Sequence, residues 1–160
     1  MITNFDMKIY GLSIIVRVVL LSLGCYIDNL QESVKYTDID YIVFTQAGIH
    51  LVNGKSPYDQ ETYRYSPILA LFMIPNGAIV WFGKVLFCIA DVYIVQIVDS
   101  LLQDVADEVF EADRSRAHEC REYIHFLWSV NPFSSNIASR GSADSISSLL
   151  LLWLIKMVCI

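Results

Sequence analysis

The sequence from residue 9 to residue 27 reads IYGLSIIVRVVLLSLGCYI. Apart from two serines and Arg17 it is apolar, and a helix of this length measures about 28 Å at 1.5 Å per residue. The hydrocarbon core of a bilayer is about 30 Å thick, so we expect a first transmembrane helix here. A cleaved signal peptide beginning at Lys8 is the competing interpretation, although residues 22–24, Ser-Leu-Gly, make a poor cleavage site.

Arg17 lies in the middle of this expected helix. A charge at such a depth costs at least about 2.5 kcal/mol, so the side chain should face protein, water or a lipid headgroup. A structural ion pair with another helix is the alternative, and the sequence leaves both open.

The composition of the whole chain also favours a membrane. Of the 160 residues 55% are hydrophobic, and the mean hydropathy is +0.48. The net charge of −6 and the scattering of the 11 basic residues exclude nucleic acid as a partner. The cysteines lie far apart without a C-x-x-C pair, which argues against a disulfide framework or a zinc site: Cys25, Cys88, Cys120 and Cys159.

Further apolar stretches predict an all-α, polytopic membrane helix bundle that forms one domain. In residues 78–102, Lys84, Asp91 and Asp99 share one helical face, which favours pairing between helices. The expected segments are a first span (9–27), a loop with interfacial helices (28–77), a second span (78–102), a charged cytosolic loop (103–122), a third span (123–138) that Asn131-Pro132 should break, and a fourth span (145–160) cut off by the chain end.

The loop of residues 28–77 should contain a short amphipathic helix. Thr37 or Asp38 is placed to cap it, Phe44 lies on its apolar face, and Asn53-Gly54 should end it. We expect this helix to lie at the membrane surface with its aromatic face among the headgroups. The apolar run 68–74 is too short to cross and is interpreted as re-entrant or surface-packed.

Asp38 and Asp40 form an Asp-x-Asp pair at the start of this helix. Within a helix two residues at this spacing point about 200° apart, so they converge on one ligand only where extended chain enters the helix. The plain alternative is that Asp38 caps the helix and Asp40 favours its positive end.

The same loop carries Tyr63-Arg64-Tyr65, which predicts a guanidinium between two aromatic rings, suited to an anionic headgroup or phosphate. An interfacial aromatic anchor is the alternative. Counting crossings brings the turn with Arg140 and Asp144 to the same membrane face as the Asp-x-Asp pair. The distribution of basic residues favours the lumen for that face.

Several motifs recur together in this order, and they resemble GPI mannosyltransferase I of the PIG-M type, in its N-terminal portion. The motifs are Tyr36-Thr37-Asp38-Ile39-Asp40-Tyr41, Gly54-Lys55-Ser56-Pro57-Tyr58, Thr62-Tyr63-Arg64-Tyr65-Ser66-Pro67, Phe82-Gly83-Lys84 with Asp91, Asn131-Pro132, and Ser139-Arg140-Gly141 with Ala143-Asp144-Ser145.

The resemblance implies a GT-C fold in the endoplasmic reticulum membrane with a lumenal active site. It implies transfer of the first α1,4-linked mannose from dolichol-phosphate-mannose to a glucosaminyl-phosphatidylinositol precursor, and a small membrane subunit of the PIG-X/Pbn1 type as partner. The family's Asp-x-Asp motif corresponds to Asp38 and Asp40.

An inverting transfer needs a carboxylate base and positive charge near the departing phosphate. We therefore expect Asp38 or Asp40 as base and Arg64 and Arg140 at the phosphate, with Tyr63, Tyr65 and Asp144 at the substrates. The sequence indicates no particular cofactor apart from the donor substrate dolichol-phosphate-mannose, and a divalent metal between the carboxylates stays open. Two other classes are weighed against the enzyme: a truncated, non-catalytic membrane remnant that acts by helix packing or partner binding, and a transporter.

Overall fold

The structure, a computed structural model, describes residues 4–30, 34–109 and 114–159, and its regular elements over these ranges are all helical. The predicted all-α class is therefore confirmed. The elements in chain order are α1 (Asn4–Leu30), α2 (Ile39–Val52), η1 (Pro57–Asp59), α3 (Pro67–Phe72), η2 (Ile74–Gly77), α4 (Phe82–Val109), α5 (Arg114–Ser129), α6 (Pro132–Arg140) and α7 (Asp144–Cys159).

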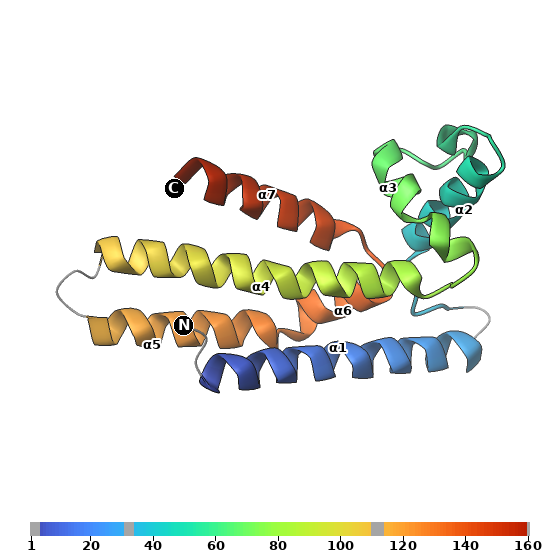
Figure 1. Cartoon of the computed structure of the whole chain (residues 1–160). Coiled ribbons are helices and arrows are strands. Elements are labelled where there is room, and N and C mark those ends of the chain that lie inside the picture. The colour runs from blue at the N-terminus through green and yellow to red at the C-terminus, as the bar shows by residue number, and fades with distance from the viewer. Residues whose placement is uncertain (1–3, 31–33, 110–113, 160) are drawn as a thin grey trace.

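The long helices lie side by side and the short ones gather at one end. Helices α1 and α4 run along the length of the molecule with α5 and α6 against them, while α7 packs on α4 (Figure 1). Helices α2 and α3 lie together at the end where α1 finishes and α4 begins (Figure 1). The polar loop is thus folded into a small helical unit on the end of the bundle.

Two helical segments are long and apolar enough to cross a membrane, Met7–Leu30 and Phe82–Asp104. Phe126–Arg140 and Asp144–Val158 form a pair bent by 117°, which gives a third span if the pair is counted as one. The expectation of two separate further spans, 123–138 and 145–160, stays a prediction. Proline breaks the first of these segments, because α5 ends at Ser129 and α6 begins at Pro132.

Residues 103–122 were expected to form a charged loop with some helix, and the part that the structure describes is helical. Helix α4 continues to Val109 and α5 begins at Arg114, so only 110–113 fall outside the described ranges. The charged residues here are mostly long side chains with good helix propensity, and Gln103 Nε2 donates to Asp99 Oδ2 one turn away at 3.1 Å. Charge alone does not interrupt a helix whose polar groups can face outward.

The short helical unit has its own core, formed with the first turns of α4. Its buried members come from α2, the following loop, α3 and α4: Tyr41, Phe44, Ala47, Tyr63, Ala70, Met73 and Phe87. Gly48 allows close approach, since a Cβ there would lie 2.9 Å from the carbonyl carbon of Met73. The predicted exposure of the aromatic face of α2 is wrong, because Tyr41 and Phe44 are 2% and 1% exposed.

Candidate functional site

Asp38 is the N-cap of α2. Its backbone is extended (φ −61°, ψ 142°) and its carboxylate Oδ1 accepts the Asp40 N–H at 3.1 Å. The capping interpretation made from the sequence is therefore confirmed, and the requirement that extended chain enter the helix at this point is met. The second oxygen, Oδ2, accepts no hydrogen bond from any other described residue, so it is open to a ligand.

Asp40, in the first turn of α2, is held by Tyr65. The Tyr65 hydroxyl donates to Asp40 Oδ2 at 2.6 Å, and the Tyr65 ring packs edge-on against Phe44 with centroids 4.7 Å apart. This hydrogen bond is the main reason that the pKa of Tyr65 is raised to about 12; burial and the charges of Asp40, Asp144 and Asp38 add to it. Tyr65 is consequently a neutral donor at physiological pH, surrounded by three carboxylates.

The turn between α6 and α7 reaches the same place from the far end of the sequence. The Asp38 N–H donates to the Arg140 carbonyl at 2.9 Å, and Arg140 Nε donates to the Tyr36 carbonyl at 3.0 Å. Gly141 has φ +95°, and a Cβ there would lie 2.8 Å from Cγ of Tyr41. The structure therefore brings together the two segments that crossing counts placed on one membrane face.

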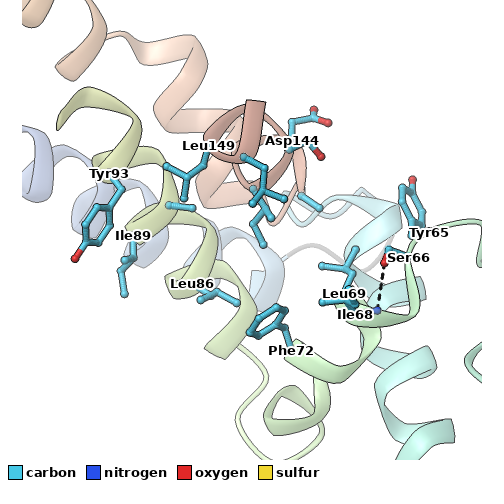
Figure 2. Close-up of a pocket in the computed structure, with 15 residues that line it drawn as sticks. Tyr65, Ser66, Ile68, Leu69, Phe72, Leu86, Ile89, Tyr93, Asp144 and Leu149 are labelled. Atoms are coloured by element: carbon cyan, nitrogen blue, oxygen red, sulfur yellow. Dashed lines mark hydrogen bonds between the residues drawn. The ribbon is translucent and has the colours of Figure 1, made fainter. Parts of the chain in front are cut away.

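An apolar groove of about 590 Å³ is lined in part by Tyr65 and Asp144, and Asp40 is joined to it through the Tyr65 hydroxyl. Its walls come from α3, α4 and the start of α7, and its residues include Ile68, Leu69, Phe72, Leu86, Ile89, Tyr93, Ile146, Leu149 and Leu150. Figure 2 shows the polar ends of Tyr65 and Asp144 at one edge of the groove, above its apolar lining. A site with apolar walls, the Asp144 carboxylate at one edge and Asp40 bonded to the lining residue Tyr65 suits an amphiphile with a polar headgroup.

The segment 63–65 differs from its prediction. The rings of Tyr63 and Tyr65 pack on each other with centroids 5.8 Å apart, so the Arg64 guanidinium does not lie between them. Arg64 is exposed and its Nη1 donates to the Tyr63 carbonyl at 2.9 Å. Tyr63 is fully buried with its hydroxyl on the Ser66 carbonyl at 2.6 Å, which gives it a packing role.

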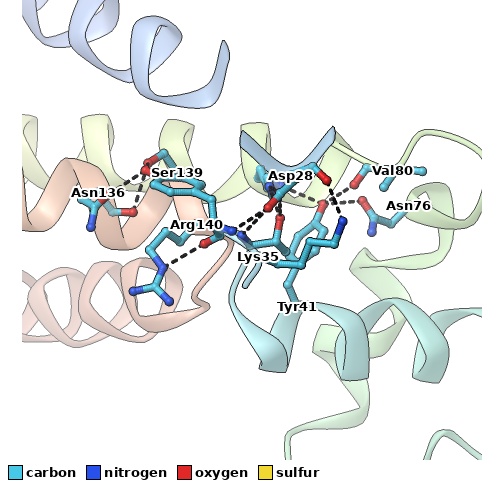
Figure 3. Close-up of polar contacts among 11 residues, drawn as sticks. Asp28, Lys35, Tyr41, Asn76, Val80, Asn136, Ser139 and Arg140 are labelled. Carbon is cyan, nitrogen blue, oxygen red and sulfur yellow. Dashed lines mark hydrogen bonds and ion pairs between the residues drawn. The ribbon is translucent and has the colours of Figure 1, made fainter. Parts of the chain in front are cut away.

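A second polar cluster joins α1, the 34–38 segment and α4, and sequence reasoning did not find it (Figure 3). Asp28 accepts the Tyr36 N–H at 2.6 Å, the Thr37 N–H at 3.1 Å and the Thr37 hydroxyl. Lys84 Nζ lies 3.5 Å from Asp28 Oδ2 and donates to Thr37 Oγ1 at 2.5 Å. Only the position of Lys84 on a polar stripe hinted at such pairing.

Tyr36 and Tyr41 fix this cluster to the rest of the molecule. The Tyr36 hydroxyl lies 2.6 Å from Asn136 Oδ1 and 2.7 Å from Ser139 Oγ, and burial raises its pKa. The Tyr41 hydroxyl lies 2.6 Å from Asn76 Oδ1 and accepts the Lys84 N–H at 3.2 Å. Burial raises the pKa of Tyr41 to about 12. These tyrosines hold the start of α2 in a defined orientation.

Arg17 forms the structural ion pair that the sequence left open. Its Nη2 lies 2.5 Å from Asp91 Oδ2, and both side chains are almost fully buried. Arg17 Nη1 donates to the carbonyls of Ser13 and Ser129 at 3.0 and 3.1 Å. The guanidinium therefore joins α1, α4 and α5 inside the bundle and is not part of the site.

Within the described ranges no group of three His, Cys, Asp or Glu side chains is arranged to hold a metal ion. One oxygen of Asp38 and one of Asp40 are already engaged, by the Asp40 N–H and the Tyr65 hydroxyl. We therefore assign no metal ligand here.

These features define a membrane protein whose described residues form helices, with an apolar groove lined in part by Tyr65 and Asp144. No family model and no solved structure matches the chain. It is 40% identical over 144 residues to GPI mannosyltransferase 1 of Dictyostelium discoideum, covering 89% of this chain and 31% of that protein. It is 38% identical to GPI mannosyltransferase 1 of Saccharomyces cerevisiae, covering 89% and 33%.

A relative from Danio rerio, described as GPI alpha-1,4-mannosyltransferase I, catalytic subunit, is 34% identical, with 90% of this chain and 34% of the relative covered. The chain is thus a homologue of GPI mannosyltransferase 1, and the resemblance drawn from its motifs is confirmed. It spans about a third of the length of the curated relatives it matches.

Proposed function

We propose that this chain carries the headgroup site of a GPI mannosyltransferase that works at a membrane surface. The observation that supports this most directly is the position of Asp38, Asp40 and Asp144 around Tyr65, next to an apolar groove. A transferase with lipid-linked substrates needs such an arrangement, because the lipid lies in the membrane plane while the reacting sugar must reach the base. The names of the relatives supply the class of reaction.

The finer proposal is transfer of the first α1,4-linked mannose from dolichol-phosphate-mannose to the glucosamine of a glucosaminyl-phosphatidylinositol precursor. In an inverting displacement the bond from mannose C1 to the acceptor oxygen forms as the bond from C1 to the phosphate oxygen breaks. The electron pair leaves with the dolichyl phosphate, and the acceptor hydroxyl gives its proton to a carboxylate. A β-linked donor then gives an α-linked product.

The groups available for these tasks are few. Asp38 and Asp40 each keep one carboxylate oxygen without a hydrogen bond to another described residue, so either can take the proton. For the phosphate, Arg140 uses only Nε within the described structure, on the Tyr36 carbonyl, and Arg64 is exposed nearby in the sequence. Guanidinium groups stabilise phosphate charge well because they donate two parallel hydrogen bonds.

We further propose an endoplasmic reticulum location with the site facing the lumen and a small membrane partner subunit of the PIG-X/Pbn1 type. The support for a helical partner is the outward apolar surface of the spans, which includes Ile15 and Val18 on α1 and Leu150 and Leu154 on α7. Such a surface suits lipid and partner helices equally in composition.

The test is mannose transfer by microsomes from cells that lack GPI mannosyltransferase 1, after expression of this chain. With labelled dolichol-phosphate-mannose and the glucosaminyl lipid, we expect labelled product from the wild-type chain and none from the Asp38→Asn/Asp40→Asn double variant. Asp59→Asn is the matched control, since this exposed carboxylate in the same loop accepts only the Ser56 N–H, at 3.2 Å. A wild-type chain without transfer, in cells where the chain is inserted, would favour a non-catalytic role in helix packing or partner binding.

A further inference from the structure

We infer that Tyr65 is a positioning residue for the transfer reaction, which holds the Asp40 carboxylate at the edge of the groove through its hydroxyl. This inference rests on the proposed function. It adds that Tyr65 orients the Asp40 carboxylate while the carboxylate accepts the proton. The sequence placed Tyr65 at the substrate, whereas the geometry gives it a different partner, since its hydroxyl lies on Asp40 Oδ2 at 2.6 Å.

Asp40 depends on an outside partner for its orientation. Its backbone N–H is engaged by the Asp38 carboxylate, and its own side chain makes no other hydrogen bond with the described residues. A carboxylate at an exposed helix start is otherwise free to rotate about two side-chain torsions, and fixing it before the substrate arrives lowers the barrier to proton transfer. The Tyr65 hydroxyl occupies one oxygen and leaves the other for the acceptor hydroxyl.

Tyr65 is itself firmly held. Its ring contacts Phe44 at 4.7 Å and Tyr63 at 5.8 Å between centroids, both edge-on. Its carbonyl accepts the Tyr58 hydroxyl at 3.3 Å. Tyr63 is fully buried, so the Tyr65 ring packs against the core of the α2 and α3 unit. Although Tyr65 is 37% exposed, these contacts place its hydroxyl where it can orient the carboxylate.

The same segment also forms one edge of the groove. Ser66, the next residue, caps α3 by accepting the Ile68 N–H at 3.3 Å, and α3 provides a wall of the groove. Figure 2 shows Tyr65 and Ser66 adjacent to the α3 side chains Ile68 and Leu69. The Tyr65 to Asp40 hydrogen bond therefore joins the wall that would contact a lipid chain to the carboxylate that would contact the sugar.

The protonation state is consistent with this role. Donation to Asp40 raises the pKa of Tyr65 to about 12, and the hydroxyl, protonated at neutral pH, gives its proton to the hydrogen bond with Asp40 and does not serve as a base. The proton of the acceptor goes to the carboxylate and not to Tyr65.

The first experiment compares steady-state transfer by the wild-type chain and its variants. We expect Tyr65→Phe to lower kcat about tenfold with little change in KM for either substrate, because it removes a hydrogen bond to a charged group and no apolar contact. Tyr123→Phe is the control: it removes the hydroxyl of a 69% exposed tyrosine on α5 that makes no hydrogen bond with another described residue, and its rates should stay within about twofold of the wild type.

A double-variant cycle separates positioning from a general structural effect. If Tyr65 acts through Asp40, adding Tyr65→Phe to Asp40→Asn lowers the rate no further. Additive losses, or a Tyr65→Phe variant with the kcat of the wild type, would overturn the inference.

A second readout does not need activity. In the purified chain with tyrosines labelled at Cζ, the NMR titration of Tyr65, assigned by its absence in Tyr65→Phe, should have its midpoint near pH 12 and move toward 10 in Asp40→Asn. An unmoved midpoint overturns the inference. A moved midpoint in a chain that transfers no mannose overturns the proposed function and leaves the Tyr65 to Asp40 hydrogen bond established.

Discussion

Two tyrosines of the short helical unit have raised pKa values for different reasons. The pKa of each is raised to about 12, mainly by burial at Tyr41 and mainly by the Asp40 hydrogen bond at Tyr65. The Tyr41 hydroxyl lies within hydrogen-bonding distance of Asn76 Oδ1, the Val80 carbonyl and the Lys84 N–H. Tyr65 lies instead at the edge of a groove.

The difference separates structural polar groups from reactive ones. In the enclosed cluster of Tyr41, Asn76 and Lys84, the polar atoms are hydrogen-bonded to other protein groups. Such a cluster fixes the orientation of the helices that it joins. Beside Tyr65, which lines the groove, Asp38 and Asp40 keep oxygens with no partner among the described residues. A shifted pKa is therefore a guide to function here only when the geometry shows an open atom.

The largest effect should come from Asp40→Asn. Loss of a general base lowers kcat by about 10²- to 10⁴-fold, while the half-exposed side chain contributes little to the free energy of unfolding. Transfer assays and unfolding of the purified variant would be measured together. If Asp40→Asn lost stability and activity together, Asp40 would be a structural group like those of the enclosed Tyr41 cluster.

Asn76→Ala should have the opposite profile. Asn76 is 1% exposed; its Oδ1 accepts from Tyr41 and from the Gly83 N–H at 3.0 Å, and its Nδ2 lies 2.5 Å from Thr45 Oγ1. Removing it leaves buried groups unpaired and should lower the free energy of unfolding by about 3 kcal/mol. The measurement is denaturant unfolding in detergent micelles, with Asn53→Ala on the exposed end of α2 as control. Equal stabilities for the two variants would contradict the enclosed network.

Gly141→Ala should cost about 2 kcal/mol, because the position has φ +95° and a Cβ would meet the Tyr41 ring. The same unfolding measurement checks this value. Gly11→Ala provides the control, since a Cβ there has no atom within 4 Å. A Gly141→Ala variant as stable as Gly11→Ala would show that the turn does not depend on glycine.

Two substitutions of Asp38 should separate its role as helix cap from a role in the transfer reaction. Asp38→Ala removes the cap of α2 and should lower stability by about 1 kcal/mol, whereas Asp38→Asn keeps a good capping side chain and removes the charge. A loss of transfer in Asp38→Asn at unchanged stability would assign a chemical role to this carboxylate. Full transfer in Asp38→Asn would leave Asp40 as the base.

The smallest effect is confined to alkaline pH. A tyrosine whose pKa is raised on folding stabilises the fold fully below its ordinary value of 10, and this contribution is lost as the pH rises toward 12. Thermal unfolding between pH 10 and 12 should therefore show a falling midpoint. Tyr41→Phe and Asp40→Asn should each reduce the slope, the first by removing the buried phenol and the second by releasing Tyr65. A slope unchanged in Asp40→Asn would contradict the cause assigned to Tyr65.

Local sequence signals predicted much of the fold but less of the site. The cap at Asp38, the end of α2 at Asn53 and the break before Pro132 follow from short-range backbone rules and are all present. The length of the helices within 103–122 was not predicted, and the burial of the aromatic face of α2 was missed. The burial of that face depends on what packs against it, and apolar spacing does not contain that information.

By itself the sequence determined the helical class, the helix caps and the order of motifs that identifies the relatives, because these depend on residues close together in the chain. Tertiary structure alone decided which polar groups meet. It paired Arg17 with Asp91 and Lys84 with Asp28. It also formed the hydrogen bonds from the Asp38 N–H to the Arg140 carbonyl and from the Tyr65 hydroxyl to Asp40. Those contacts join distant segments, and the free energy that selects them comes from burial and hydrogen bonding in the assembled molecule.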